Sequence, residues 1–265
     1  MKVKDKIIVV TGAGSGMGRE LTIQLVKKGA KVAMVDIHQE GLEQTAELAG
    51  KDKVSIHVLN ITDREKVNQL PEKVKAIHGA VDGLINNAGI IQPFVDVKDL
   101  DYAVIERVMN VSFYGTLYMT KAFLPDLLLR PEAHIANVSS MGGFIPFPGQ
   151  TFYSASKAAV KILTEGLYSE LKGTNVGVTV IHPGAVNTNI MKNSDIKSPS
   201  TEASARGGQK VLSAEKAAAI MIDGIEQNKF RVLVGKDASM LDMLYRFNPK
   251  MAVDLIVKKM KGMVR

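Results

Sequence analysis

Short apolar runs alternate with amphipathic segments along most of the chain. The apolar runs are rich in Val, Ile and Leu, as in strands buried on both faces of a parallel sheet. They lie at residues 6–10, 31–35, 54–59, 81–85, 134–139, 176–181 and 230–234. Segments with helical periodicity separate them, at residues 19–28, 39–48, 63–77, 100–128, 153–172 and 213–227, and within 63–77 only Pro71 departs from the helical pattern. This order predicts an α/β fold with one doubly wound parallel sheet of about seven strands and helices on both faces.

Two stretches depart from this alternation. Residues from about 187 to 212 are rich in Ser, Asn, Thr, Lys and Gly and lack clear periodicity, which favours a substrate lid beside a crevice. Residues from about 236 to 265 predict a C-terminal helical extension, in which Asn248 and Pro249 mark a helix start. No repeat, low-complexity tract or linker divides the chain, so we expect a single domain over residues 1–265.

The first predicted strand runs directly into a glycine-rich turn, Thr11-Gly12-Ala13-Gly14-Ser15-Gly16-Met17-Gly18. A helix follows, and the second strand ends at Asp36. Glycines in this position let the backbone approach a pyrophosphate, which the amides at the helix start then bind. A carboxylate after the second strand accepts hydrogen bonds from a ribose 2′-hydroxyl and repels a 2′-phosphate. The unit therefore predicts a Rossmann-type dinucleotide site that prefers NAD, with NADP as the alternative.

Tyr153 and Lys157 stand four residues apart near the start of a long predicted helix. Residues at this spacing share one helix face, and a lysine cation beside a tyrosine lowers the pKa of the phenol. Such a pair supplies a general acid or base near neutral pH without a metal ion. On its own, the spacing is equally typical of a solvated helix face. The pair can act as an acid or base only if it faces a bound reactant. We expect such a site in the crevice beyond the carboxyl ends of the strands, where Asp36 and residues 86–89 also lie.

Composition narrows the chemistry that the chain can perform. There is no cysteine, and the five histidines show no metal-ligand spacing, so we expect no metal site. The net charge of +7 is concentrated in residues 245–265, which hold six cations and one anion. No basic stripe with interleaved aromatic residues occurs, so we expect no nucleic-acid partner. The lack of cysteine, of a leader-like segment and of a membrane-length apolar run predicts a cytoplasmic protein.

The basic, amphipathic tail leaves three interpretations open. Its apolar side chains pack over the domain and roof a substrate pocket, meet a second subunit, or make a peripheral contact with a membrane surface. Several of these side chains are methionines, which adapt to varied shapes, and this favours a bulky hydrophobic substrate.

Taken together, these motifs resemble the short-chain dehydrogenase/reductase family, classical type. The resemblance runs from Lys6 to about Gly235 and rests on the glycine turn, the Asn-Asn-Ala-Gly motif at 86–89, the Tyr153–Lys157 pair, and a Pro-Gly turn with a following threonine. It implies a catalytic set of Asn110, Ser140, Tyr153 and Lys157. It implies a cofactor-binding set of Gly12, Ser15, Gly16, Met17, Gly18, Asp36, Asn60, Ile61, Asn87, Ala88, Gly89, Tyr153, Lys157, Pro183, Gly184, Val186 and Thr188.

The resemblance also implies a role for each catalytic residue. Tyr153 exchanges the proton, and Lys157 lowers the pKa of Tyr153 and binds the nicotinamide ribose. Ser140, rather than Ser139, donates a hydrogen bond to the substrate oxygen, and Asn110 holds a water that links Lys157 to solvent. The family often has an aspartate where this chain has Asn60, whose amide oxygen accepts the same hydrogen bond from adenine.

The implied activity is that of an NAD-dependent oxidoreductase that interconverts a secondary alcohol and a ketone or aldehyde, in a homodimer or homotetramer. Three alternatives stay open: an NADPH-dependent carbonyl reductase of the same fold, an NAD-bound epimerase or dehydratase, and a nucleotide-binding regulatory protein without catalysis. The complete catalytic set favours an enzyme, because a protein without catalysis has no physical need for all four residues.

Overall fold

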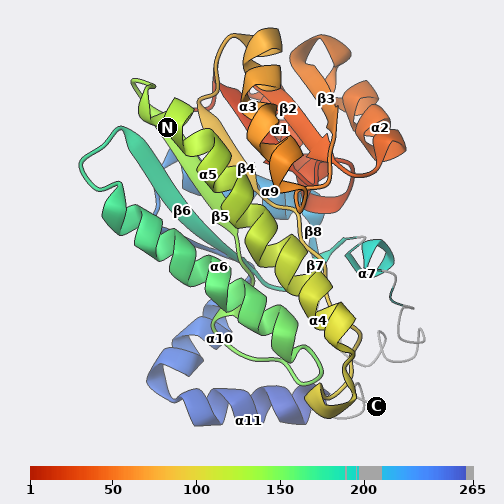
Figure 1. The fold of residues 1–265 in the computed structure, drawn as a ribbon. Helices are drawn as coiled ribbons and strands as arrows, with labels where there is room; N and C mark the ends of the chain where they lie inside the picture. Colours follow the sequence, from red (N-terminus) through yellow and green to blue (C-terminus); the bar gives the residue numbers. More distant parts are fainter. Residues whose placement is uncertain (189, 195, 197–210, 261–265) are drawn as a thin grey trace.

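A seven-stranded parallel sheet forms the centre of the computed structural model, which describes residues 1–188, 190–194, 196 and 211–260 (Figure 1). Its hydrogen-bonded order is β3-β2-β1-β4-β5-β6-β9. The strands are β1 (Ile7–Thr11), β2 (Lys31–Asp36), β3 (Val54–Val58), β4 (Gly83–Asn86), β5 (Ala133–Val138), β6 (Val176–Pro183) and β9 (Arg231–Val234). The predicted doubly wound sheet is thereby confirmed, with each strand within two residues of its expected bounds.

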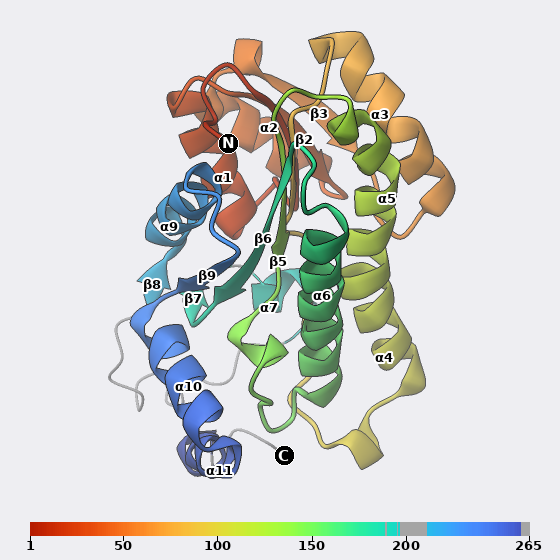
Figure 2. The ribbon, with the colours of Figure 1, turned by 90° about the vertical axis from the view of Figure 1, so that its left-hand side faces the viewer.

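Helices cover both faces of the sheet, as the edge-on view in Figure 2 shows. One face carries α1 (Gly16–Lys27), α2 (Gln39–Ala49) and α9 (Ala214–Glu226). The other carries α3 (Arg64–His78), α5 (Gly115–Leu128) and α6 (Thr151–Glu170). Each face has its own buried apolar cluster, with Leu21 and Met221 in the first and Leu70 and Phe123 in the second. The apolar stripes of these helices therefore bury both faces of the strands, as the continuous apolar runs require.

The sheet reverses its direction of winding at β1, which pairs with β2 on one side and with β4 on the other. In doubly wound sheets, this switch point leaves a crevice beyond the carboxyl ends of the two central strands. Thr11 ends β1 and Asn86 ends β4, so the glycine turn and the Asn-Asn-Ala-Gly motif meet at this crevice.

The helix expected at residues 100–128 is interrupted. It consists of α4 (Tyr102–Met109), a π-helical turn (Asn110–Tyr114) and α5. A π-helical turn holds an extra residue and changes which side chains face inward, and such turns are frequent at functional sites. Proline does not break the helices here, because Pro71 lies inside a continuous α3 and Pro125 inside α5.

The C-terminal extension forms two further helices, α10 (Lys236–Phe247) and α11 (Pro249–Met260), below the sheet in Figure 1. The predicted helix start is confirmed: Pro249 is the first residue of α11, and the Asn248 side-chain oxygen accepts the Met251 N–H at 3.0 Å. Both helices pack on the segment after β5, where Ile145 is fully buried against their apolar side chains. Among the described helices, none is long and apolar enough to cross a bilayer.

Most of the predicted lid lies outside the described residues, namely 189, 195 and 197–210. The described parts are its two ends and the short helix α7 (Ile190–Asn193). The ends come together in a small parallel pair, β7 (Val186–Asn187) with β8 (Leu212–Ser213). The segment therefore leaves and rejoins the body of the protein at one place.

Candidate active site

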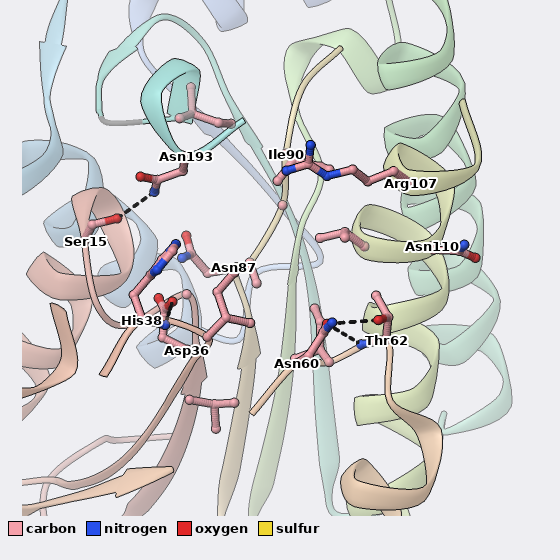
Figure 3. Close-up of a pocket in the computed structure, with 18 of the residues that line it drawn as sticks. Ser15, Asp36, His38, Asn60, Thr62, Asn87, Ile90, Arg107, Asn110 and Asn193 are labelled. Atoms are coloured by element: carbon pink, nitrogen blue, oxygen red, sulfur yellow. Dashed lines mark hydrogen bonds between the residues drawn. The ribbon is translucent and has the colours of Figure 1, made fainter. Parts of the chain in front are cut away.

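A cavity of about 510 Å³ opens at the switch point, with walls from several strand ends (Figure 3). Most of the predicted cofactor residues line it: Gly12, Ser15, Gly16, Met17, Asp36, Asn60, Ile61, Asn87, Ala88, Gly89 and Thr188. Helix α6 lies directly behind this wall, because a Cβ on Gly89 would come within 3.0 Å of the Lys157 Nζ. The volume falls within the range of small-molecule and cofactor sites.

The glycine turn has a backbone that only glycine adopts without strain. Gly12 and Gly16 have φ values of +70° and +52°. A side chain on Gly18 would collide with the Gly12 carbonyl, so this glycine allows α1 to start directly behind the turn. The first turn of α1 has no acidic residue and no side-chain cap. Its free amides are therefore suited to binding a pyrophosphate, and the residues present fit a dinucleotide.

Asp36 is held at the end of β2 by two backbone amides. Its Oδ2 accepts the Gly14 N–H at 2.9 Å, and its Oδ1 accepts the His38 N–H at 3.1 Å. The carboxylate thus stays at the cavity wall, beside the glycine turn (Figure 3). This arrangement places a fixed negative charge where a ribose would lie in such a site.

Asn60 lines the cavity, but its side-chain oxygen is already engaged. It accepts the Thr62 N–H at 3.0 Å and the Thr62 hydroxyl at 2.9 Å (Figure 3). Both lone pairs of the amide oxygen have partners within the protein. An adenine amino group would therefore have to share this oxygen with Thr62, which differs from the free acceptor expected from the sequence.

The structure brings together Ser140 and Tyr153. Ser140 follows β5, and its Oγ accepts the Gly142 N–H at 3.0 Å, which leaves its proton free for donation. Tyr153 lies on the first turn of α6, and its ring is near the Ser140 hydroxyl: a Cβ on Gly142 would lie 3.4 Å from the Ser140 Oγ and 3.6 Å from the Tyr153 Cε1. The neighbouring Ser139 is buried and donates to the Lys157 carbonyl at 2.7 Å. Ser140 is therefore the serine that faces the tyrosine.

The pKa of Tyr153 is shifted in the direction opposite to our expectation. Burial raises the pKa of the phenol, and the hydrogen bond from Ser140 lowers it by a smaller amount. Lys157 is 3% exposed, its Nζ donates to the Val138 carbonyl at 3.0 Å, and burial lowers its pKa to about 8. Burial thus favours the neutral form of both groups.

Asn110 lines the cavity. It begins the π-helical turn, is exposed, and points away from the other labelled side chains in Figure 3. Ser112, two residues later, is fully buried, and its Oγ lies 3.4 Å from the Ile90 nitrogen and 3.3 Å from the Ile90 carbonyl oxygen. The same Oγ would lie 3.6 Å from a Cβ on Gly89, whose other neighbour is Lys157. Within this turn, Ser112 is therefore the residue whose side chain lies next to the contact between Gly89 and Lys157.

Three further contacts were not expected from the sequence. Asp237, at the start of α10, accepts the Ala185 N–H at 2.7 Å and so fixes the turn after Pro183-Gly184. Asn193 of α7 donates to the Ser15 hydroxyl at 2.9 Å, across the cavity mouth (Figure 3). Ser194 accepts the Ile91 N–H at 3.0 Å. These long-range contacts carry no local sequence signal.

The fold and the cavity define a Rossmann-type oxidoreductase that binds a nicotinamide dinucleotide. Residues 6–198 match the model of the short chain dehydrogenase family. The protein belongs to this family.

Related proteins cover almost the whole chain. An oxidoreductase of Mycobacterium tuberculosis, SadH, is 37% identical over 251 residues, which are 92% of this chain and 91% of the relative. A short chain dehydrogenase/reductase from Burkholderia phymatum, solved with NAD, has a TM-score of 0.85 at 24% identity, over 95% of this chain and 96% of that one. A short chain dehydrogenase from Burkholderia cenocepacia, solved with NADP, has a TM-score of 0.82 at 26% identity, over 97% and 99%.

Proposed function

We propose that this protein interconverts a secondary alcohol and a ketone or aldehyde, with NAD as the preferred cofactor. The observation that carries the proposal is the proximity of the Ser140 hydroxyl and the Tyr153 ring around Gly142, with Lys157 of the same helix directly behind the cavity wall at Gly89. An acid/base residue and a hydrogen-bond donor converge there without a metal ligand set among the described residues. This combination suits proton exchange at an oxygen that gains or loses charge.

Each residue has a defined task in this proposal. A bound nicotinamide supplies the acceptor or donor of the hydride. Tyr153 takes the alcohol proton in oxidation and returns it in reduction. Ser140 donates its free proton to the substrate oxygen as negative charge develops there. Lys157 stabilises the phenolate when it carries its charge, and Ser112 holds the Ile90 backbone beside it.

The cofactor preference rests on Asp36. Its carboxylate is fixed by two amides at the cavity wall and would repel a 2′-phosphate. NADP-dependent carbonyl reduction is the second candidate, because the cavity is also lined by the cation Arg107 and by His38. A regulatory protein without catalysis is a weaker candidate, since it gives no account of the proximity of Ser140 and Tyr153.

An apolar cluster lies next to the segment that follows Ser140. The segment after Ser140 carries Phe144 and Phe147, which pack with the α10 and α11 side chains. These helices contribute Met260 and Leu244 to the same cluster. This surrounding supports a bulky hydrophobic substrate.

The test is to assay NADH formation with a panel of secondary alcohols, steroids, retinoids, polyols and 3-hydroxyacyl compounds. With any substrate that turns over, Tyr153→Phe should retain NAD binding and lose about 10²–10⁴-fold in turnover, the usual contribution of acid/base catalysis. Unchanged turnover would remove Tyr153 from the mechanism. Tight NAD binding without turnover of any compound would favour the regulatory alternative.

A further inference from the structure

Gln92 is a fully buried polar residue in the loop that follows the Asn-Asn-Ala-Gly motif. Its side chain joins this loop to residues 149–153, about 60 positions later in the sequence. The Nε2 donates to the Gly149 carbonyl at 2.9 Å. The Oε1 accepts the N–H groups of Phe152 and Tyr153, at 2.9 and 3.0 Å. One amide therefore joins the cavity-lining loop to the residue at the centre of the proposed chemistry.

These bonds replace a missing local cap. Helix α6 begins at Thr151, and its N-cap residue Gln150 makes no side-chain capping bond. The first amides of a helix have no partner within the helix and need one from elsewhere. Gln92 supplies it for two of them, and Gln150 donates in return to the Gln92 carbonyl at 2.6 Å. The loop and the start of α6 are thus joined by hydrogen bonds donated from both sides.

The loop that carries Gln92 also contacts other parts of the site. Gly89, three residues before Gln92, packs against Lys157, one helical turn beyond Tyr153. Ile91, the residue before Gln92, donates its N–H to Ser194 after the lid helix α7. The same short loop therefore contacts the cavity, the lid and both residues of the Tyr153–Lys157 pair.

We propose that Gln92 is a positioning residue, which holds the first turn of α6 against the cofactor loop and so sets the position of the Tyr153 phenol relative to Ser140. This inference rests on the proposed function. A displaced phenol moves away from the Ser140 hydroxyl beside it, and misplacement of a reacting group by about 1 Å costs about 10²-fold in rate. Nothing else among the described side chains accepts the Tyr153 N–H.

The test compares Gln92→Met, Gln92→Glu and the control Gln24→Met in the full-length protein. Methionine keeps the volume of Gln92 and removes its hydrogen bonds, whereas glutamate keeps the acceptor for the two amides. Gln24 also donates its side-chain amide to a backbone carbonyl, that of Glu215 at 2.8 Å, but between α1 and α9. The Tyr153 pKa is read from phenolate absorbance with saturating NAD, as the difference between each protein and its Tyr153→Phe counterpart.

Gln92→Met should raise the Tyr153 pKa and lower turnover by about ten- to a hundred-fold, with little change in NAD affinity. The Tyr153 pKa and the turnover of Gln92→Glu should be closer to those of the unmodified protein, and those of Gln24→Met should equal them. In a Tyr153→Phe background, Gln92→Met should cause no further loss. An unchanged Tyr153 pKa, or equal losses in both backgrounds, would overturn the inference. If Tyr153→Phe alone leaves turnover unchanged, the proposed function fails instead.

Discussion

The protonation of Tyr153 is set by burial more than by its neighbours. Burial raises the pKa of the phenol and lowers the pKa of the Lys157 ammonium to about 8, which shifts both groups toward their neutral forms. A neutral phenol is the form that donates a proton to a carbonyl oxygen. The protein's own groups therefore favour Tyr153 as an acid, whereas the positive charge of an oxidised nicotinamide would favour it as a base.

Asp36 offers a direct test of cofactor choice. Asp36→Asn removes the negative charge and keeps a side-chain oxygen for one of the two amides, those of Gly14 and His38, that the carboxylate accepts. We expect the preference for NAD over NADP, measured as the ratio of kcat/KM values, to narrow by about ten-fold or more, since one like-charge contact of about 1.4 kcal/mol corresponds to ten-fold. Asp52→Asn, in an exposed turn, is the matched control. A preference of the unmodified protein for NADP would contradict our interpretation of Asp36.

Two individual residues have surroundings that the sequence did not predict. Asn110 was chosen by resemblance, and in the π-helical turn that begins there Ser112 is the buried residue. Helical spacing alone does not reveal an added residue in one turn. Asn60 was placed correctly at the cavity, but its bonds with Thr62 depend on a local turn conformation. Ser140 was selected over Ser139 by the resemblance and Tyr153 by its spacing from Lys157, and the two residues lie at a strand end and a helix start.

Among the elements, α10 is anchored to the sheet by a partly buried ion pair. Arg231 of β9 donates two hydrogen bonds to the Asp242 carboxylate, at 2.9 and 2.7 Å, and Arg246 adds a third at 3.0 Å. The side chains of Arg231 and Asp242 are only 13% and 12% exposed. Arg231 also stacks over Phe144, with its guanidinium carbon 5.3 Å from the ring centre. This cluster holds the C-terminal extension next to the segment that follows Ser140.

Asp242→Asn should therefore destabilise the protein by about 2 kcal/mol, because it leaves the Arg231 charge poorly compensated in a site with little water. Asp254→Asn is the matched control, since its pair with Lys250 is exposed and lies within α11. That change should alter the free energy of unfolding by less than about 0.5 kcal/mol. Urea unfolding measures both, and equal effects of the two substitutions would show that the cluster does not anchor α10.

The element pattern was largely predictable, and the exceptions share one cause. Each strand of the sheet and each long helix follows from apolar periodicity, and the Ser213 cap is confirmed by its bond with the Lys216 N–H at 3.3 Å. The start of α6 is different, because its cap comes from Gln92, 60 residues or more away in sequence. Local patterns predict local caps, whereas a cap from another loop depends on the tertiary fold.

At the scale of the whole molecule, the residues of the candidate site lie at one edge of the sheet because the strands are parallel. Parallel strands place all their carboxyl ends on the same side, and the reversal at β1 opens the crevice there. The repeated strand–helix units predicted a doubly wound parallel sheet, and the order of its strands comes from the structure. The opposite edge carries a different feature, a set of buried polar groups that includes His134, whose Nε2 contacts the Thr179 hydroxyl at 2.8 Å.

Three buried histidines make the free energy of unfolding depend on pH. Burial lowers the pKa of His57 and His182 to about 4 and that of His134 to about 3. The folded protein therefore keeps these rings neutral at pH values where the unfolded chain, with an ordinary histidine pKa near 6.5, takes up protons. The unfolded state then binds more protons than the native state, so stability falls as the pH decreases below about 6.5. The loss continues until the pH reaches the native pKa values.

We expect the free energy of unfolding to fall between pH 6.5 and 4.5 by up to about 1.4 kcal/mol per pH unit for each of the three histidines. His134→Gln should reduce this slope by about a third, because it removes one buried titrating ring and keeps a hydrogen-bonding group for Thr179. His38→Gln, an exposed histidine at the start of α2, is the control and should leave the slope as it is. Urea unfolding at successive pH values gives the slope. If His134→Gln and His38→Gln have the same slope, proton exclusion by the buried ring does not govern acid stability.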